Sequence, residues 1–577
     1  MVLIINSYSL HHHYIKPIMY VYNMKIGVLL LALGCSVAAA AQNTIGLPRI
    51  INYTKTDYRG GSQTWDIRQD SAGLLYFANN EGLLTYDGTF WKDYPLPNKT
   101  IMRSLAIDPG GKVYAGGQGE LGYFLPGEQG RLEYHSLLSE LPADQRNFAD
   151  IWDIEIFGSA VFFRALDRII EWNNGQCRVF RARSEWVWLK KMDNRLYAQD
   201  VAQGLFEWRE NQWHPLPGSG KLTYRSIMGM LAHGQDSTLL LTGRDGGYWM
   251  VRDSIVSAQQ FPPSLFGSDI NTAVALNKDE FLVGTISSGA YVLNYKGNHI
   301  QTLGRKEGLL NNNILCTLLD RDGNLWAGMN NGICFIAYNA AVKYIHPNVD
   351  NELAGYGARI QNGRLFMASS DGAYEVNLDL SKDDLSFSRG EFRMVNGTAG
   401  QVWRLDEVNG QILMAHNNGT YVLRPGFSER IALEPSWLFM PTSPVLPSEE
   451  ILVGTYTGLK RLGYAGGQFK NEGNLNGLYE SLRFLAMGND GQIWASHPYR
   501  GIYRIQLSAD HNSYNAELLT SEHGLPSDLG NHVFRVQNRI VFATEKGAYE
   551  FDVPSSRFIK CPFLGPVLGD IELRYLK

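Results

Sequence analysis

The feature that most limits what this chain can fold into is a unit that recurs about every 42 residues. Each copy carries a glycine followed by a short apolar or aromatic segment, as in residues 82–86, 332–335 and 501–503. Eleven copies have the glycine, and residues 168–172 occupy the same phase without it, which makes twelve copies. We therefore expect a fold assembled from one supersecondary unit.

Each copy has the composition of three or four short strands joined by tight turns. A polar turn with a glycine, such as 70–73 or 320–323, separates two apolar segments, and the marker glycine opens a third. One such sheet cannot bury both faces alone, whereas copies arranged around an axis bury them against each other. Propeller blades have periods of about 40 to 45 residues, while β-solenoid coils and leucine-rich repeats are shorter. The sequence therefore predicts an all-β protein made of propeller blades.

The number of copies predicts two tandem β-propellers. A chain of 577 residues is too long for one ordinary domain. Seven markers lie between Gly82 and Gly332, which predicts a seven-bladed propeller over 42–340, closed by the segment near 51–53 pairing into the seventh blade. The other five markers predict a second propeller over 341–577. Residues 571–577 resemble the first strand of a thirteenth copy, so we expect this second propeller to be incomplete, truncated in a thirteenth blade.

The start of the chain predicts export. Met24 and Lys25 precede an apolar run over 26–37 and four alanines at 38–41, so that 24–41 is expected to be a signal peptide and 1–23 an upstream extension. Among the remaining cysteines, Cys316 and Cys334 lie two strands apart, too far for a bridge. Buried thiols are expected for these two and for Cys177 and Cys561.

Composition excludes some classes of function. Charged residues make up 19% of the chain and the formal net charge is -5, so that no basic face is available for nucleic acid. No Gly-x-Ser-x-Gly elbow, His-Glu-x-x-His pair or phosphate loop occurs. Asp320, Asp322 and Asn324 alternate as calcium ligands would, but Gly323 comes too early for an EF-hand and no closing glutamate follows, which favours a plain turn. We expect no metal and no cofactor.

The repeat resembles that of two-component regulator propellers, found in periplasmic sensor regions of Bacteroidetes regulators. The resemblance is carried by residues 320–328, by the marker at Asn331 and Gly332, and by the linkers at 308–311 and 524–527. In that family two seven-bladed propellers precede a tyrosine-rich domain, a membrane helix and a histidine-kinase or helix-turn-helix output. The resemblance implies a periplasmic sensor that contacts the membrane only through parts that this sequence does not contain, with the full-length relative anchored in the inner membrane. It leaves a homodimer open.

Aromatic and arginine side chains recur at the start of the first strand of a copy. Trp65, Arg103 and Arg483 each precede their turn glycine by eight residues, so they are expected at equivalent places. If first strands line a channel, such residues cluster around one mouth and suit a sugar or an anionic oligosaccharide; the alternative is packing between blades. The predicted ligand-binding residues are Trp65, Arg103, Trp152, Trp186, Trp403 and Arg483.

These observations favour a ligand-sensing ectodomain over two other functions. The sensor binds a small molecule or oligosaccharide, with a glycan fragment as one candidate, and does not turn it over. The alternatives are a propeller lyase or hydrolase that acts on polysaccharide and a platform that captures protein partners. The expectation is that the chain is not an enzyme.

Overall fold

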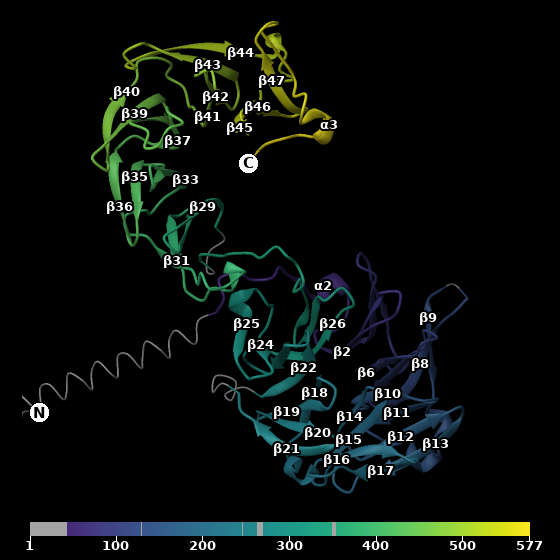
Figure 1. The fold of residues 1–577 in the computed structure, drawn as a ribbon. Helices are drawn as coiled ribbons and strands as arrows, with labels where there is room; N and C mark the ends of the chain where they lie inside the picture. The colour runs from purple at the N-terminus through teal and green to yellow at the C-terminus, as the bar shows by residue number, and fades with distance from the viewer. Residues whose placement is uncertain (1–42, 129, 245, 262–268, 349–352, 577) are drawn as a thin grey trace, which may run out of the picture. The chain divides into compact units, whose positions relative to one another are not determined.

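The chain forms two compact units, as seen in a computed structural model that describes residues 43–128, 130–244, 246–261, 269–348 and 353–576. The first unit is Asn43–Ile345 and the second begins at His346 (Figure 1). The predicted signal peptide, 24–41, and the predicted extension, 1–23, lie outside the described residues. No helix in the described ranges is both long and apolar enough to cross a membrane.

Twelve antiparallel sheets of four strands make up the described residues, which confirms the all-β repeat. In each sheet the strands follow one another in chain order from the first strand, near the axis, to the fourth at the periphery; only the seventh sheet differs. The twelve marker segments form the third strands.

The first unit has seven strands at each of the four places in the sheet. The first strands are β2 (Thr64–Gln69), β6 (Met102–Ile107), β10 (Asp153–Phe157), β14 (Trp186–Met192), β18 (Ile227–His233), β22 (Ile270–Ala275) and β26 (Ile314–Leu319). The second strands are β3 (Leu75–Asn79), β7 (Val113–Gly117), β11 (Ala160–Arg164), β15 (Arg195–Asp200), β19 (Ser237–Thr242), β23 (Glu280–Thr285) and β27 (Leu325–Met329). The third strands are β4 (Gly82–Tyr86), β8 (Glu120–Pro126), β12 (Arg168–Asn173), β16 (Gly204–Arg209), β20 (Gly246–Val251), β24 (Ala290–Asn294) and β28 (Gly332–Ile336). The fourth strands are β5 (Trp91–Tyr94), β9 (Leu132–Ser136), β13 (Gln176–Arg181), β17 (Gln212–Pro215), β21 (Ser254–Gln259), β25 (His299–Leu303) and β1 (Ile50–Tyr53).

The second unit repeats this order in five sheets. The first strands are β29 (Gly355–Gln361), β33 (Val402–Val408), β37 (Ser436–Pro441), β41 (Phe484–Met487) and β45 (His532–Val536). The second strands are β30 (Arg364–Ser369), β34 (Gln411–His416), β38 (Glu450–Thr455), β42 (Ile493–His497) and β46 (Arg539–Thr544). The third strands are β31 (Ala373–Asn377), β35 (Gly419–Arg424), β39 (Gly458–Ala465), β43 (Gly501–Leu507) and β47 (Gly547–Asp552). The fourth strands are β32 (Arg393–Met394), β36 (Phe427–Ala432), β40 (Gln468–Asn474), β44 (Tyr514–Leu519) and β48 (Arg557–Lys560).

The helices among the described residues are short, with three or four residues each. They are α2 (Lys55–Tyr58), α3 (Gly565–Leu568) and the 3-10 turns η1 (Leu138–Glu140), η2 (Ala143–Gln145), η3 (Ser219–Leu222), η5 (Arg305–Glu307), η6 (Leu385–Phe387) and η7 (Ser521–His523).

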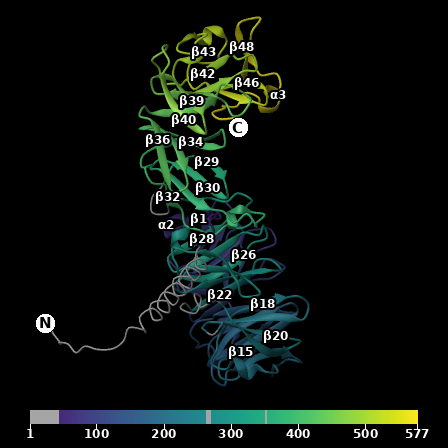
Figure 2. The ribbon, with the colours of Figure 1, turned by 60° about the vertical axis from the view of Figure 1, so that its left-hand side comes forward.

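The first unit is a closed ring of seven sheets. Its first strands pack in cyclic order, and β26 of the seventh sheet packs on β2 of the first (Figures 1 and 2). The fourth strand of the seventh sheet is β1, which pairs antiparallel with β28 from Ile50 opposite Ile336 to Tyr53 opposite Ile333. The sequence predicted this closure by the segment near 51–53. Because the seventh sheet contains strands from both the start and the end of the unit's chain, its hydrogen bonds hold the ring closed.

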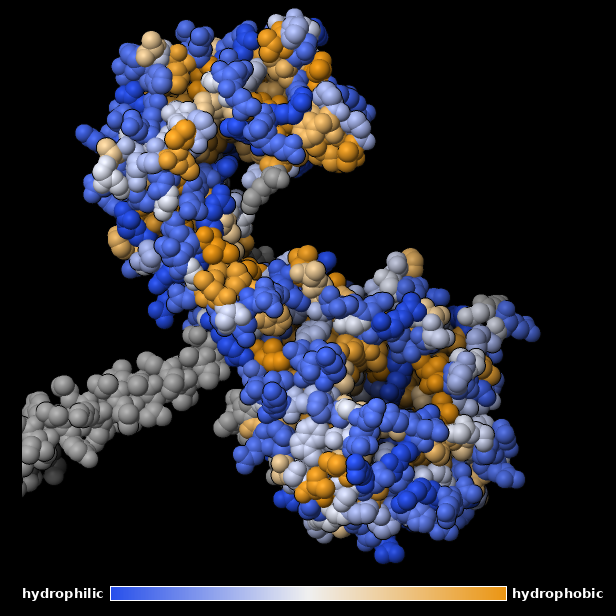
Figure 3. Space-filling model, in the orientation of Figure 1, coloured by the Kyte–Doolittle hydropathy of each residue, from blue (hydrophilic) through white to orange (hydrophobic). Residues whose placement is uncertain are grey.

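The second unit is an open arc. Its five sheets follow one another from β29 to β45, and β29 and β45 are not packed on each other (Figures 1 and 2). The outer face of the first sheet is uncovered, since Ile360 of β29 is 51% exposed. The other end carries α3, where Figure 3 shows apolar surface and where Val567 and Ile571 are exposed.

The marker glycine is required by close approach of the chain. Gly82 has φ +124°, and a Cβ at this position would lie 2.5 Å from the carbonyl oxygen of Tyr94. Gly501 has φ +102°, and its Cβ would lie 2.4 Å from the carbonyl oxygen of Leu519. In both sheets the chain that leaves the fourth strand crosses directly over the start of the third, so glycine marks the phase of the repeat.

The end of the chain differs from the expectation. Residues 571–576 form no strand, although the sequence predicted one over 571–577. The backbone N–H of Leu573 donates to the carbonyl of Thr544 (2.9 Å), just as that of Leu482 donates to Thr455 (3.1 Å) where the chain enters β41. The segment therefore follows the path of a first strand, but no neighbouring strand among the described residues pairs with it.

The four cysteines that the structure describes are free thiols. Cys316 on β26 and Cys334 on β28 are buried, as is Cys561, in agreement with the sequence. Burial raises the pKa of Cys334 to about 12. Cys177 is only half-buried, in contrast to the expectation, because it lies on β13 at the periphery of its sheet.

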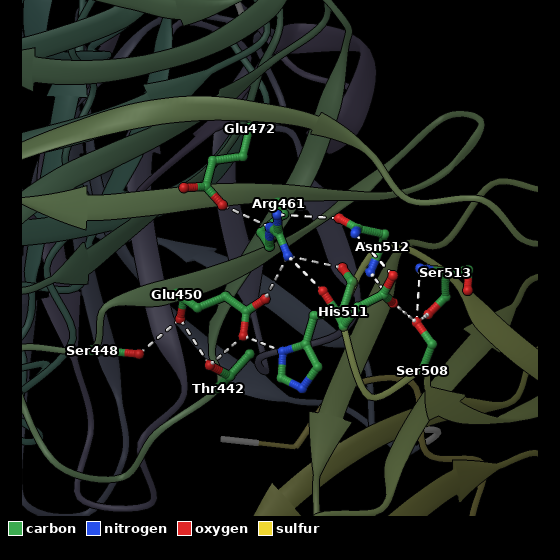
Figure 4. A network of polar contacts seen from close by, with 10 residues as sticks. Thr442, Ser448, Glu450, Arg461, Glu472, Ser508, His511, Asn512 and Ser513 are labelled. Carbon is green, nitrogen blue, oxygen red and sulfur yellow. Dashed lines mark hydrogen bonds and ion pairs between the residues drawn. The ribbon is translucent and has the colours of Figure 1, made fainter.

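A polar network links two neighbouring sheets of the second unit (Figure 4). His511, in the turn after β43, contacts the Glu450 carboxylate of β38 through Nδ1 (2.7 Å). Arg461 of β39 binds Glu472 (2.7 Å) and donates to the carbonyl oxygen of His511 (3.1 Å). These contacts tie the third sheet of the arc to the fourth at their periphery.

Candidate ligand-binding site

A bulge at the start of the first strand recurs in nine of the twelve sheets. The register between first and second strands shifts by one residue there, for example between Thr64 and Asp66 in β2. The side chain of the extra residue does not follow the alternation of side-chain directions along the strand. The bulged residues are Trp65, Arg103, Val187, Met228, Asn271 and Leu315 in the first unit and Tyr356, Trp403 and Trp437 in the second.

Trp152 and Arg483 belong to the same set, because each directly precedes the first strand of its sheet, β10 or β41. Five of the six residues predicted from the sequence therefore occupy one structural position. They belong to two units, however, and line two cavities instead of one mouth.

Trp186 occupies a different place. It is paired in β14 one residue before the bulge, is 5% exposed and packs on Phe206 and Trp213. Its indole Nε1 donates to the carbonyl of Phe180 (3.1 Å). The bulge residue of this sheet is Val187, and a shift by one residue moves a side chain to the other face of the strand. The packing alternative holds for Trp186.

The first cavity is the central channel of the closed ring, with a volume of about 440 Å³. First strands of all seven sheets line it, including Trp65, Arg103 and Trp152. The guanidinium of Arg103 lies between the two indoles, 4.0 Å from the ring of Trp65 and 4.7 Å from that of Trp152. Its Nε donates to Asp150 (3.0 Å), so the charge of Arg103 is paired and the group is a fixed part of the wall.

Deeper in this channel, charged side chains neutralise one another. Arg68 contacts Asp66 (3.2 Å), and Lys190 contacts Glu155 (3.0 Å). Burial raises the pKa of Asp66 above its usual value, although Arg68 opposes this. Asp66 also accepts the backbone N–H of Leu105 from the next sheet (3.0 Å).

The same arrangement recurs in the third sheet. Asp153 accepts the N–H of Leu189 (3.0 Å) and binds Arg164 (2.5 Å). Sequence reasoning missed these charged residues as channel-lining groups. The signal was present, since Trp-Asp-Ile occurs at both 65–67 and 152–154.

The second cavity lies within the arc of the second unit and has a volume of about 940 Å³. Aromatic rings form one wall: Tyr356 lies 5.2 Å from Trp403, which lies 4.8 Å from Trp437. Trp437 stacks on Tyr456 at 4.3 Å with planes 15° apart. Trp403 Nε1 donates to the hydroxyl of Tyr456 (2.9 Å). The hydrogen bonds and stacking fix the orientation of both indoles.

Arg483 lies at the edge of this wall, with its guanidinium 4.2 Å from the ring of Trp437. It is exposed to solvent. The positive charge of Arg483 also acts on two histidines. Burial lowers the pKa of His532 and of His497, and the charge of Arg483 lowers both pKa values further. An aromatic surface next to an exposed cation can bind a planar or ring-shaped ligand.

Comparison with known proteins identifies the repeat. Residues 308–331, which span the entry to the seventh sheet and its first two strands, match the family described as two component regulator propeller. The chain carries a two-component regulator propeller repeat. This confirms the resemblance seen in the sequence. No curated protein matches the chain.

Solved structures share the fold. The extracellular domain of the putative hybrid two component system BT3049 from B. thetaiotaomicron aligns with a TM-score of 0.63 and 15% identity, over 89% of this chain and 72% of that chain. The corresponding domain of BT4673 from the same organism gives 0.41 and 15%, over 89% and 79%. Streptogramin B lyase gives 0.41 and 12%, over 51% and 99%. The likeness to BT3049 establishes that the regulator propeller repeats of this chain form tandem propellers.

Within the regulator propeller repeat, the acidic turn is structural. Asp320 Oδ1 accepts the backbone N–H groups of Asp322 (3.0 Å) and Asn324 (2.8 Å), and Oδ2 accepts Nε1 of Trp326 (3.1 Å). The carboxylate of Asp320 is thus occupied by its own hairpin, as the plain-turn interpretation of the sequence expected.

Proposed function

We propose that this chain is the ligand-binding part of an exported sensor of the two-component type, and that it binds its ligand without turnover. The observation that carries this proposal is the tandem-propeller fold shared with the extracellular domain of a hybrid two component system. The predicted signal peptide at 24–41 is consistent with a periplasmic location.

The second cavity is the proposed binding site. Its wall of Tyr356, Trp403 and Trp437 offers fixed aromatic faces, on which a sugar ring or another flat group can lie. The channel of the first unit is the weaker candidate, because its arginine is already sandwiched and its acids are already paired. A glycan fragment is the first ligand class to test.

Calorimetric titration of the exported chain with a panel of neutral and acidic oligosaccharides tests the proposal. We expect saturable heat for at least one member, and mass spectrometry should recover that member unchanged. Trp403→Ala should weaken binding about tenfold, because this change in affinity corresponds to the free energy of one lost aromatic contact. Cleaved product would instead identify an enzyme, and capture of proteins without small-molecule binding would identify an interaction platform.

A further inference from the structure

The second cavity has a one-sided charge. Among the described residues that line it are four arginines, and none of these lining residues is an aspartate or a glutamate. The lining of the first channel, by contrast, includes three acidic and four basic side chains. A concave site lined by one sign of charge attracts ligands of the opposite sign.

The four arginines are only partly neutralised by their surroundings. Arg359 (3.3 Å) and Arg404 (2.9 Å) share the single carboxylate of Asp406. Arg535 donates to the uncharged amide of Asn489 (2.8 Å). Arg483 has no ion pair or hydrogen bond with any described residue and lies over Trp437. Among the described residues, a single carboxylate, that of Asp406, therefore pairs with two of these four arginines, and the other two have none.

The comparison with Arg103 shows that this is specific to the second unit. Both arginines precede the turn glycine of their sheet by eight residues, and both lie over an indole. Arg103 is paired with Asp150 from the neighbouring sheet. In the chain that enters the sheet next to Arg483, Leu529 stands three residues before β45, as Asp150 stands three residues before β10. The acid next to it, Asp528, accepts the backbone N–H of Ser521 (2.6 Å).

Other acids near Arg483 in the sequence are occupied. Glu480 binds Arg500 (2.7 Å) and contacts His497 (3.2 Å). The guanidinium is held in orientation by Trp437, whose Nε1 donates to Ser481 (3.1 Å). Stacking fixes the plane of a guanidinium while its N–H donors remain available at the edge, which is the geometry that binds carboxylate and sulfate in bidentate fashion.

We propose that the second cavity binds an acidic ligand, with a carboxylate or sulfate group on Arg483 and an attached ring on Trp403 and Tyr356. This rests on the proposed function and adds the charge of the ligand and the residue that selects it. Neutral molecules of the same shape bind weakly, because they leave the positive wall uncompensated.

Matched probes that differ by one charge test this: glucuronate against glucose, N-acetylglucosamine 6-sulfate against N-acetylglucosamine, and benzoate against benzamide. Ligand-observed NMR titrations of the full chain give the affinities. We expect the anionic member of at least one pair to bind about tenfold or more tightly than its neutral partner, and the difference to shrink with added salt.

Arg483→Gln should weaken binding of the anion by about 10- to 100-fold, the range for a lost charge-assisted hydrogen bond, and Arg483→Lys by less. The matched control is Arg504→Gln, which removes an arginine paired with Glu517 on the outer strands and should leave binding unchanged. Because Arg483 is exposed, Arg483→Gln should have the same melting temperature as the wild type, and so should the control variant.

Equal affinity for both members of every pair, or an unchanged affinity in Arg483→Gln, would overturn the proposal. If neutral oligosaccharides bind and no anion does, the acidic-ligand proposal fails while the sensor proposal stands. If no oligosaccharide of the panel and no anion binds the wild type, both fail.

Discussion

The two units are built from the same sheet but differ in how they end. In the first unit, β1, from the start of the unit, completes the seventh sheet, whose other strands come from the end of the unit. The central channel is narrow, and its charged side chains pair with one another. In the second, β29 and β45 do not meet, the inner cavity is about twice as large, and its arginines outnumber the acids around it. The difference teaches that the repeat specifies the sheet, whereas the sheet-to-sheet contacts and the bulge residues specify what the centre can bind.

The strongest way to break this comparison is to open the first ring. Deleting residues 43–53 removes β1 and should lower the melting temperature of the first unit by about 10 °C or more, because several kcal/mol are lost at roughly 2–4 °C per kcal/mol. Differential scanning calorimetry should show two transitions, and the transition of the second unit is the internal control. If the first transition stayed in place, strand closure would not explain the difference between the units.

The second way is to give the first unit an unpaired arginine. Asp150→Ala leaves the guanidinium of Arg103 without its carboxylate, and its side chain is only 13% exposed. We expect a loss of about 3–5 kcal/mol in the free energy of unfolding of the first unit. Arg483→Gln, at the same position of an exposed site, should change stability by less than about 0.5 kcal/mol. Chemical denaturation of both variants checks this; similar losses would contradict the contrast between the two arginines.

The marker glycine should behave alike in both units. Gly82→Ala and Gly501→Ala each bring a Cβ within 2.5 Å or less of a backbone carbonyl oxygen at positive φ, and should cost about 2–4 kcal/mol. Gly491→Ala is the matched control: it has φ +79° with open space around the Cβ, and should cost about 1 kcal/mol. Denaturation midpoints measure all three. A cost confined to one unit would show that the repeat does not specify the same sheet twice.

Mild acid should separate the units further. Burial lowers the pKa of His416, His497 and His532, all in the second unit, below the usual 6.5. Below that pH the unfolded chain takes up protons that the folded unit does not, so the free energy of unfolding decreases as the pH falls. Melting scans between pH 7.5 and 5.5 should show the second transition moving down more than the first. Parallel movement of both transitions would exclude these histidines as the cause.

The smallest effect is expected at the peripheral network. His511→Ala removes the contact with Glu450, but the histidine is 44% exposed, so the second unit should lose less than about 1 kcal/mol. The transition midpoint in urea measures this loss. A loss above 2 kcal/mol would mean that this network, and not the apolar packing of neighbouring sheets, holds the arc together.

Much of the fold could be read from the sequence. The glycine markers, the polar turns and the segment near 51–53 predicted the strands, their order in the sheet and the closure of the first ring, because these depend on local backbone geometry and on alternation along a strand. The site was accessible in part: Trp65, Arg103 and Trp403 are bulge residues, and Trp152 and Arg483 directly precede the first strands of their sheets. Trp186 was misplaced by one residue, since a bulge is invisible in a list of apolar residues yet reverses the direction of a side chain.

By itself, then, the sequence determined the repeating sheet and the residue type at each inner position, because both are written in a short, local pattern. Only the tertiary structure decided which of those residues remain free to contact a ligand. Arg103 contacts Asp150 and Trp152 of the next sheet, whereas Arg483 contacts Trp437 and no carboxylate among the described residues. Charge pairing across sheets joins residues that are distant in the chain, so no local pattern records it.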